Sequence, residues 1–126
     1  MEFSRTGIIL CTENYGDCVS FYSETLELPI MFSLNDEQSQ LTCCDMGGGN
    51  YLMIEKGGIA APGKKSLEQN PVWLRFNVSD VEDIAKQLTK KNVNVNIRRE
   101  LWGTVADFVD PDGNVCSLRD EASFGQ

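Results

Sequence analysis

Residues 108–114 read Phe108-Val109-Asp110-Pro111-Asp112-Gly113-Asn114 and carry the clearest structural signal of the chain. Proline and glycine separate two apolar segments here, and the order Asp-Pro-Asp-Gly is typical of a tight turn between strands. A second Gly-Asn pair, Gly49-Asn50, lies 64 residues before Gly113-Asn114 (113 − 49). The same turn therefore occurs twice, which indicates an internal repeat.

The repeat extends outward from this turn to a helix in each half. Gly7 corresponds to Trp73 and Asn14 to Asp80, both at an offset of 66 (73 − 7; 80 − 14). Apolar residues recur with the helical period in two segments and alternate with polar residues elsewhere, which predicts the order β-α-β-β-β, linker, β-α-β-β-β. The expected helices lie within Tyr15–Leu26 and Asp80–Lys91, and the expected strands are Gly7–Glu13, Pro29–Leu34, Gln40–Asp45, Tyr51–Lys56, Val72–Val78, Val93–Arg99, Gly103–Val109 and Val115–Arg119.

Each expected helix begins at a residue that can cap it. Asn14 is suited to cap the first helix, and Ser79 or Asp80 the second, because their short side chains accept hydrogen bonds from free backbone N–H groups. We predict one α+β domain over residues 1–126, with repeat unit one at about 6–57, a linker at about 58–71 and repeat unit two at about 72–120. The linker is rich in Gly and Pro and contains Lys64 and Lys65.

Composition excludes several classes of partner. The 126 residues include 11 Lys and Arg against 19 Asp and Glu, a net charge of −8, whereas nucleic acids and anionic membrane surfaces need a basic footprint. No segment approaches the roughly 20 apolar residues of a membrane helix, and no signal peptide is visible. The five cysteines are odd in number and lack a CxxC spacing, so we expect reduced thiols in a cytoplasmic protein.

The two-fold repeat resembles the vicinal oxygen chelate superfamily, which includes glyoxalase I, extradiol dioxygenases and bleomycin-resistance proteins. Phe21-Tyr22, Leu26 and Leu28-Pro29 carry this resemblance in the first half, and residues 108–114 carry it in the second. The stretch Leu101-Trp102-Gly103-Thr104 is similar to the bleomycin-resistance branch. The resemblance implies two cupped mixed sheets around a central cleft, and frequently a homodimer.

Metal-dependent members of that family place ligands at up to four positions, which the register transfers onto Gly7, Met53, Trp73 and Ser117. None of these is a competent ligand for a hard or borderline divalent ion. The chain also contains no histidine, the side chain that binds metals most often and that Ser-His and Cys-His nucleophile pairs require. We therefore expect no metal and no cofactor, although a site built only from carboxylates stays conceivable.

Strand alternation divides each expected strand between a core face and a cleft face. Leu52, Ile54, Leu74, Cys116 and Leu118 are assigned to the core. The opposite face combines aromatic rings, a flexible thioether and a few charges, as small-molecule sites usually do. The predicted ligand-binding residues are Phe32, Tyr51, Met53, Glu55, Trp73, Arg75, Trp102, Ser117 and Arg119.

Several of these residues have simpler interpretations. Trp73 would serve equally as core filling, and Glu55 and Arg75 as partners in an ion pair. Trp102 would serve as a dimer contact if its strand lies at an edge, and Cys11 is interpreted as an inert thiol.

Three functions follow from this pattern. The favoured one is a metal-free protein that binds a drug-like or cationic aromatic compound through Trp73 and Tyr51, with Glu55 as counter-charge. The second is an enzyme of lyase, isomerase or dioxygenase type, with Glu55 as general base and Arg75 stabilising negative charge, or with an atypical metal site. The third is an interaction module without a small ligand.

Overall fold

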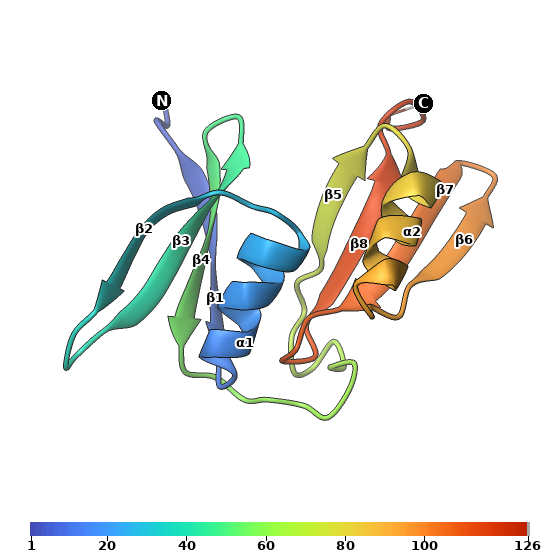
Figure 1. Cartoon of the computed structure of the whole chain (residues 1–126). Coiled ribbons are helices and arrows are strands. Elements are labelled where there is room, and N and C mark those ends of the chain that lie inside the picture. Colours follow the sequence, from blue (N-terminus) through green and yellow to red (C-terminus); the bar gives the residue numbers. More distant parts are fainter. Residues whose placement is uncertain (126) are drawn as a thin grey trace. The chain divides into compact units, whose positions relative to one another are not determined.

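The computed structural model describes residues 1–125 and divides them into two compact units, one from Met1 to Ala60 and the other from Ala61 onward (Figure 1). No helix among these residues is both long and apolar enough to cross a membrane. The first unit contains β1 (Thr6–Thr12), α1 (Tyr15–Ser20), the π-helical turn η1 (Phe21–Thr25), β2 (Ile30–Asn35), β3 (Gln40–Gly47) and β4 (Asn50–Lys56). The second contains β5 (Leu74–Val78), α2 (Val81–Lys90), β6 (Asn96–Glu100), β7 (Gly103–Val109) and β8 (Val115–Asp120).

Each unit forms one four-stranded mixed sheet with the same topology. The strand order is β1-β4-β3-β2 in the first unit and β5-β8-β7-β6 in the second. In both, the first and last strands pair in parallel and the remaining neighbours are antiparallel. The α+β fold and the tandem βαβββ repeat predicted from the sequence are therefore confirmed.

The core of each unit lies between one sheet face and its helix. In the first unit, Leu52 and Ile54 of β4 are fully buried on the face that α1 covers, together with Cys18 and Tyr22 of the helical segment. In the second unit, Leu74, Cys116 and Leu118 are buried with Val81, Ala85 and Leu88 of α2. These are the positions that alternation and helical period assign to the interior.

The first helix differs from its prediction in two ways. The α-helix ends at Ser20 and continues as a π-helical turn, where the Leu26 N–H donates to the Phe21 carbonyl at 2.9 Å. The expected cap was wrong, because the Asn14 side chain does not cap the helix; the Asn14 N–H instead donates to the Thr12 hydroxyl at 3.0 Å. The second cap is confirmed, since the Asp83 N–H donates to the Asp80 carboxylate at 3.0 Å.

Two strands begin later than predicted. β5 begins at Leu74, so Trp73 lies just outside it, and β6 begins at Asn96 instead of Val93. The alternative of Trp102 as a dimer contact depended on an edge strand, and that condition is not met. Trp102 lies in the turn before β7, and β7 is an internal strand between β6 and β8.

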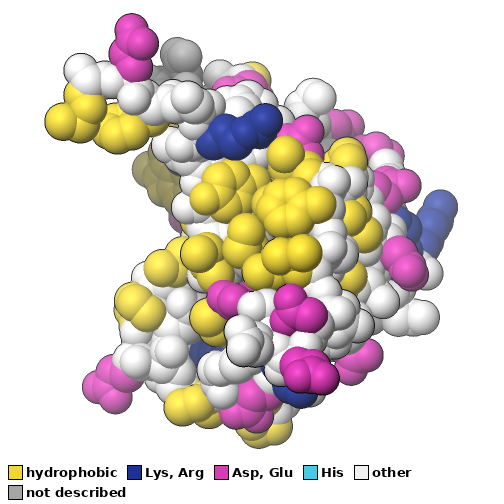
Figure 2. Space-filling model, turned by 90° about the vertical axis from the view of Figure 1, so that its left-hand side faces the viewer, with side chains coloured by type: hydrophobic (Ala, Val, Ile, Leu, Met, Phe, Trp, Pro, Cys, Tyr) yellow, Lys and Arg dark blue, Asp and Glu magenta, His cyan; other side chains and the backbone are white. Residues whose placement is uncertain are grey.

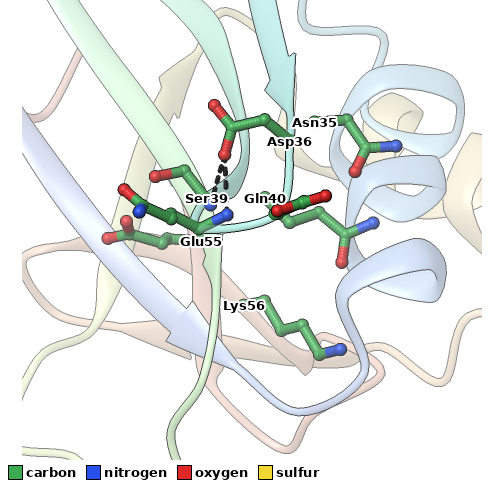
Figure 3. A pocket seen from close by; sticks show the side chains of 8 residues that line it. Asn35, Asp36, Ser39, Gln40, Glu55 and Lys56 are labelled. Carbon is green, nitrogen blue, oxygen red and sulfur yellow. Dashed lines mark hydrogen bonds between the residues drawn. The ribbon is translucent and has the colours of Figure 1, made fainter.

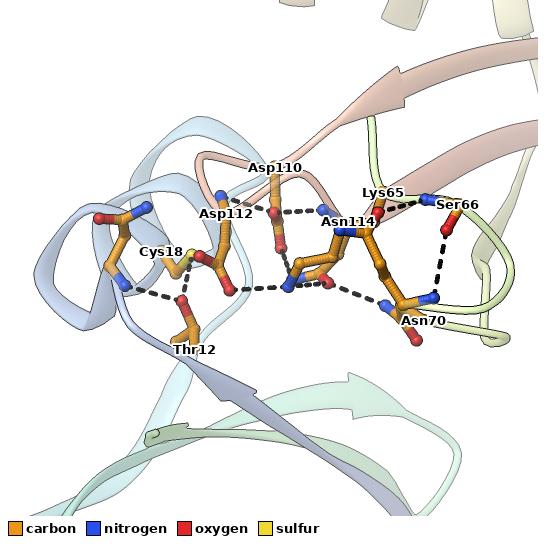
Figure 4. Close-up of polar contacts among 10 residues, drawn as sticks. Thr12, Cys18, Lys65, Ser66, Asn70, Asp110, Asp112 and Asn114 are labelled. Carbon is orange, nitrogen blue, oxygen red and sulfur yellow. Dashed lines mark hydrogen bonds and ion pairs between the residues drawn. The ribbon is translucent and has the colours of Figure 1, made fainter. Parts of the chain in front are cut away.

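Buried hydrogen bonds and an ion pair connect the segment before β5 to the Asp-Pro-Asp-Gly turn (Figure 4). Lys65 is only 6 % exposed, and its ammonium donates to Asp112 Oδ2 and to Asn114 Oδ1, both at 3.0 Å. Asp110 accepts from the backbone N–H groups of Asp112 and Asn114, each at 2.9 Å. The Asn70 amide also donates to Asn114 at 2.8 Å. Lys65, which was predicted to lie in the linker, is thus a structural part of the second unit.

Candidate functional site

The first sheet has one face that no described helix of its own unit covers, and we call it the open face of the first sheet. Residues opposite one another in register share a face, so the pairing Ile9–Met53–Cys43–Phe32 runs across all four strands. A second row follows as Cys11–Glu55–Leu41–Leu34, and a third as Gly7–Tyr51–Asp45. Four predicted ligand-binding residues, Phe32, Tyr51, Met53 and Glu55, are therefore brought together on this face.

This open face exposes large apolar side chains. Ile9 is 56 % exposed, Phe32 47 % and Leu34 50 %, and they come from the two edge strands of the sheet. In Figure 1, α1 lies on the other side of this sheet, and Figure 2 shows hydrophobic side chains gathered on the side turned away from it, with charged groups at the margin. Contiguous exposed apolar surface of this kind marks a binding surface more often than scattered single residues do.

Glu55 lies where this face meets a polar hollow (Figure 3). The hollow measures about 360 Å³ and is formed by the β2–β3 turn, residues 35–40, together with Glu55 and Lys56. Asp36 orders the turn by accepting from the N–H groups of Gln38 and Ser39, both at 2.8 Å. Within the described chain, Glu55 forms no hydrogen bond or ion pair, so its half-buried carboxylate is available to a ligand.

The corresponding face of the second sheet, which we call its open face, is polar. Ser117 on β8 is fully buried and donates to Asp107 Oδ1 at 2.9 Å, while Arg98 Nε donates to Asp107 Oδ2 at 2.9 Å. The Arg98 guanidinium also lies 3.1 Å from Glu100. The hydrogen bond with Asp107 raises the pKa of Arg98 above its ordinary value. Asp107 therefore ties three strands together with one carboxylate.

Two predicted arginines on this face differ in their surroundings. Arg119 donates to the carbonyls of Trp102 at 3.3 Å and Ser123 at 3.1 Å, and its guanidinium lies 4.5 Å from the centre of the Trp102 ring. Arg119 is thus engaged in holding the Trp102 turn and the C-terminal turn. Arg75, which pairs in register with Ser117, is exposed and has no hydrogen-bond or ion-pair partner among the residues that the structure describes.

Trp73 and Asp120 lie at the two ends of the second unit's parallel strand pair. Trp73 is 37 % exposed, and the Lys64 ammonium lies 5.1 Å from the centre of its ring. Trp73 is therefore not a side chain that merely fills the core. Asp120 accepts from the N–H groups of Thr104 at 2.7 Å and Ser123 at 3.0 Å. Hydrogen bonding with the Ser123 side chain contributes most to lowering the pKa of the Asp120 carboxyl, and the bond from the Thr104 N–H lowers it further.

The cysteines are free thiols, and all except Cys11 are buried. Adjacent Cys43 and Cys44 point to opposite faces, since Cys43 pairs with Met53 and Cys44 with Leu52. Burial raises the pKa of both thiols; for Cys43 the nearby Arg5 opposes this effect, and for Cys44 the neighbouring Cys43 adds to it. Neither is therefore an activated nucleophile.

The residues at the family's ligand positions do not fit a metal ion. The Tyr51 ring occupies the space that any side chain at Gly7 would need, and the Ser117 hydroxyl is buried and committed to Asp107. Trp73 and Met53 offer no ligand suited to a hard cation. Across residues 1–125, no three Asp, Glu or Cys side chains lie close enough together to hold a metal ion.

Four residues of these surfaces were not among the predicted ligand-binding residues. Strand alternation places Ile9 on the cleft face without singling it out, and Leu34 is conspicuous only once β2 is known to be an edge strand. Asp107 was detectable, because it lies 64 residues after Cys43 (107 − 43) and so occupies the same place in the repeat. Arg98 was not, since its reach to Asp107 depends on side-chain geometry across two strands.

Comparisons with known proteins agree on the fold. The family model described as "Glyoxalase/Bleomycin resistance protein/Dioxygenase superfamily" matches residues 6–118. No curated protein sequence gives a significant match. Among solved structures, TnmS3, an antibiotic-binding protein from Streptomyces sp. CB03234, is 21 % identical with a TM-score of 0.76, covering 95 % of this chain and 98 % of its own.

A second similar structure is a lactoylglutathione lyase from Agrobacterium tumefaciens. It is 16 % identical, with a TM-score of 0.73 and 96 % of each chain covered. A glyoxalase family protein from Enterococcus faecalis is 20 % identical, with a TM-score of 0.71, and covers 94 % of this chain and 96 % of its own. At these identities the likeness establishes the fold and leaves the activity open.

Proposed function

The chain belongs to the glyoxalase/bleomycin resistance protein/dioxygenase superfamily, and from this membership we propose that it is a metal-free small-molecule-binding protein. The observation that carries the proposal is the open face of the first sheet. Ile9, Phe32 and Leu34 expose apolar surface beside Tyr51 and the unpaired carboxylate of Glu55. An apolar surface with a few polar groups is the usual composition of a small-molecule site.

The chemistry of this face favours a drug-like, planar and cationic compound. Apolar side chains provide area, Tyr51 provides a ring that attracts cations, and Glu55 provides a counter-charge. The antibiotic-binding protein with the same fold supports a drug as the ligand class. Sequestration would require no reacting group, which agrees with the unsuitable donors at the family's metal-ligand positions.

The other predicted residues belong to the second unit, and their contact with a ligand stays a prediction. Arg75 is exposed and has no described partner, whereas Trp73, Trp102, Ser117 and Arg119 are held by contacts within the protein. We also propose a cytoplasmic homodimer, as the family resemblance implies. Light scattering against the chain mass of 14.0 kDa tests the dimer.

Binding would be tested by fluorescence titration of purified protein with planar aromatic and cationic glycopeptide antibiotics. We expect saturable binding by the wild-type protein. Phe32→Ser should weaken it about tenfold or more, because a Phe side chain that a ligand buries contributes about 1.5–3 kcal/mol. Leu101→Ser is the matched control, since Leu101 is fully exposed in the turn before β7.

Three results would contradict this proposal. Equal losses in Phe32→Ser and Leu101→Ser would remove the open face of the first sheet as the site. Stoichiometric metal in elemental analysis of the purified protein would contradict the metal-free state. Absence of any binding across the panel would favour the enzyme or the interaction-module interpretation instead.

A further inference from the structure

Tyr51 and Gly7 form an unusual pair on the open face of the first sheet. They are register partners in the parallel strands β4 and β1. A Cβ atom built on Gly7 would clash with the Tyr51 ring, at 2.2 Å from Cε2, 2.3 Å from Cζ and 2.4 Å from Cδ2. Nearly equal distances to three consecutive ring atoms place that point over the ring's face and not beyond its rim. The ring therefore lies flat on the backbone at Gly7.

Glycine is needed here for space and not for backbone conformation. Gly7 is absent from the glycines with positive φ, so an L-residue could adopt its backbone angles without strain. What alanine could not do is coexist with the ring in its present position. Aromatic rings do cover glycines on edge strands for stability alone, and β1 is an edge strand, so that explanation has to be tested.

Two carboxylates lie on the same sheet face as Tyr51. Asp45 on β3 pairs in register with Tyr51, and Glu55 lies four residues further along β4. Tyr51 itself is half-buried, so part of the ring is accessible. A flat π-surface on a sheet face that also carries carboxylates attracts a planar cation through the ring quadrupole and through charge.

We infer that the Tyr51 ring, held flat by Gly7, is a stacking platform for a planar, positively charged group of the ligand. Gly7 is a positioning residue, because it acts only through Tyr51. This inference rests on the proposed binding function and adds the place on the open face where the planar group lies.

The experiment uses 9-aminoacridine, a planar cation, as the probe, and its fluorescence as the readout. Tyr51→Leu removes the ring and should weaken binding about 3- to 30-fold, whereas Tyr51→Phe keeps the ring and should bind within twofold of wild type. Gly7→Ala should weaken binding as much as Tyr51→Leu. In the Tyr51→Leu background, Gly7→Ala should change affinity by less than about twofold, because the residue has no other role.

A second probe tests the charge. The planar anion 9-anthracenecarboxylate has a similar three-ring area, and we expect it to bind more weakly than 9-aminoacridine. Equal or tighter binding of the anion would overturn the cationic assignment. Circular dichroism of each variant confirms that a loss of binding is not a loss of folding.

The outcomes separate this inference from the proposed function. If Phe32→Ser loses binding but Tyr51→Leu and Gly7→Ala do not, the open face binds the ligand and the ring only covers a glycine; the inference is then wrong and the function stands. If Gly7→Ala weakens binding equally with and without the Tyr51 ring, Gly7 does not act through it. If wild-type protein binds none of the probes or antibiotics, both fail.

Discussion

At the scale of single residues, the second unit depends on a lysine that composition assigned to a linker. Lys65 is buried with Asp112 and Asn114, and its ammonium is 3.0 Å from an oxygen of each. A buried ion pair such as Lys65–Asp112 does not by itself make a protein more stable than apolar side chains in the same place would. Removing only one partner, however, leaves a buried charge unpaired. The conformation of the turn at residues 110–114 therefore depends on Lys65.

Lys65→Met should therefore destabilise the protein by about 3 kcal/mol, since Asp112 would retain a buried carboxylate without its cation. The free energy of unfolding from urea denaturation at neutral pH measures this. Lys64→Met is the matched control, because Lys64 is exposed and its only described contact is with the Trp73 ring, so it should cost less than about 1 kcal/mol. Equal effects of the two substitutions would show that the buried pair is not essential.

At the scale of elements, both helical segments end at a residue with a left-handed backbone. Glu27 has φ of 60° after η1, and the Leu28 N–H donates to the Tyr22 carbonyl at 3.0 Å. Asn92 has φ of 67° after α2, and the Val93 N–H donates to the Leu88 carbonyl at 3.0 Å. Glycine or asparagine is usual at this position, so Glu27 is the strained member of the pair.

Glu27→Gly should raise the free energy of unfolding by about 1 kcal/mol, because glycine adopts a left-handed backbone without the steric penalty of a Cβ atom. Asn92→Gly should change it by less, since asparagine already tolerates this conformation. Thermal or urea unfolding of the two variants gives the comparison. A destabilised Glu27→Gly would mean that the flexibility of the unfolded glycine outweighs the relief of strain.

Elements were predictable from sequence wherever a local pattern determines them. Alternation assigned Leu52, Ile54, Cys116 and Leu118 to buried positions, and the repeat predicted the shared topology of the two sheets. Local pattern failed where distant contacts decide, as for Lys65, whose partners lie 47 and 49 residues away. It also could not show that the Tyr51 ring lies on Gly7, because a side-chain orientation has no periodic signature.

At the scale of the whole molecule, the repeat duplicates topology but not chemistry. Equivalent positions on the two open faces carry different groups: Ile9 corresponds to Arg75, Cys43 to Asp107 and Met53 to Ser117. The first open face is therefore apolar and the second is charged. A fold that requires the same core in both halves leaves their open faces free to differ. This difference is the reason why we propose the first sheet as the ligand-binding sheet.

The net charge of −8 acts on every ligand that approaches the chain. It attracts cations over a distance that shrinks from about 10 Å at 0.1 M salt to about 3 Å at 1 M. Affinity for 9-aminoacridine should therefore fall several-fold as sodium chloride rises from roughly 0.05 to 0.5 M. Acridine, which has the same rings and is uncharged at neutral pH, should bind with little change or slightly more tightly, because apolar burial is not screened. Fluorescence titrations at both salt concentrations separate the contribution of charge attraction from that of apolar burial. The same salt dependence for both compounds would mean that the acidic charge of the protein plays no part in selecting its ligand.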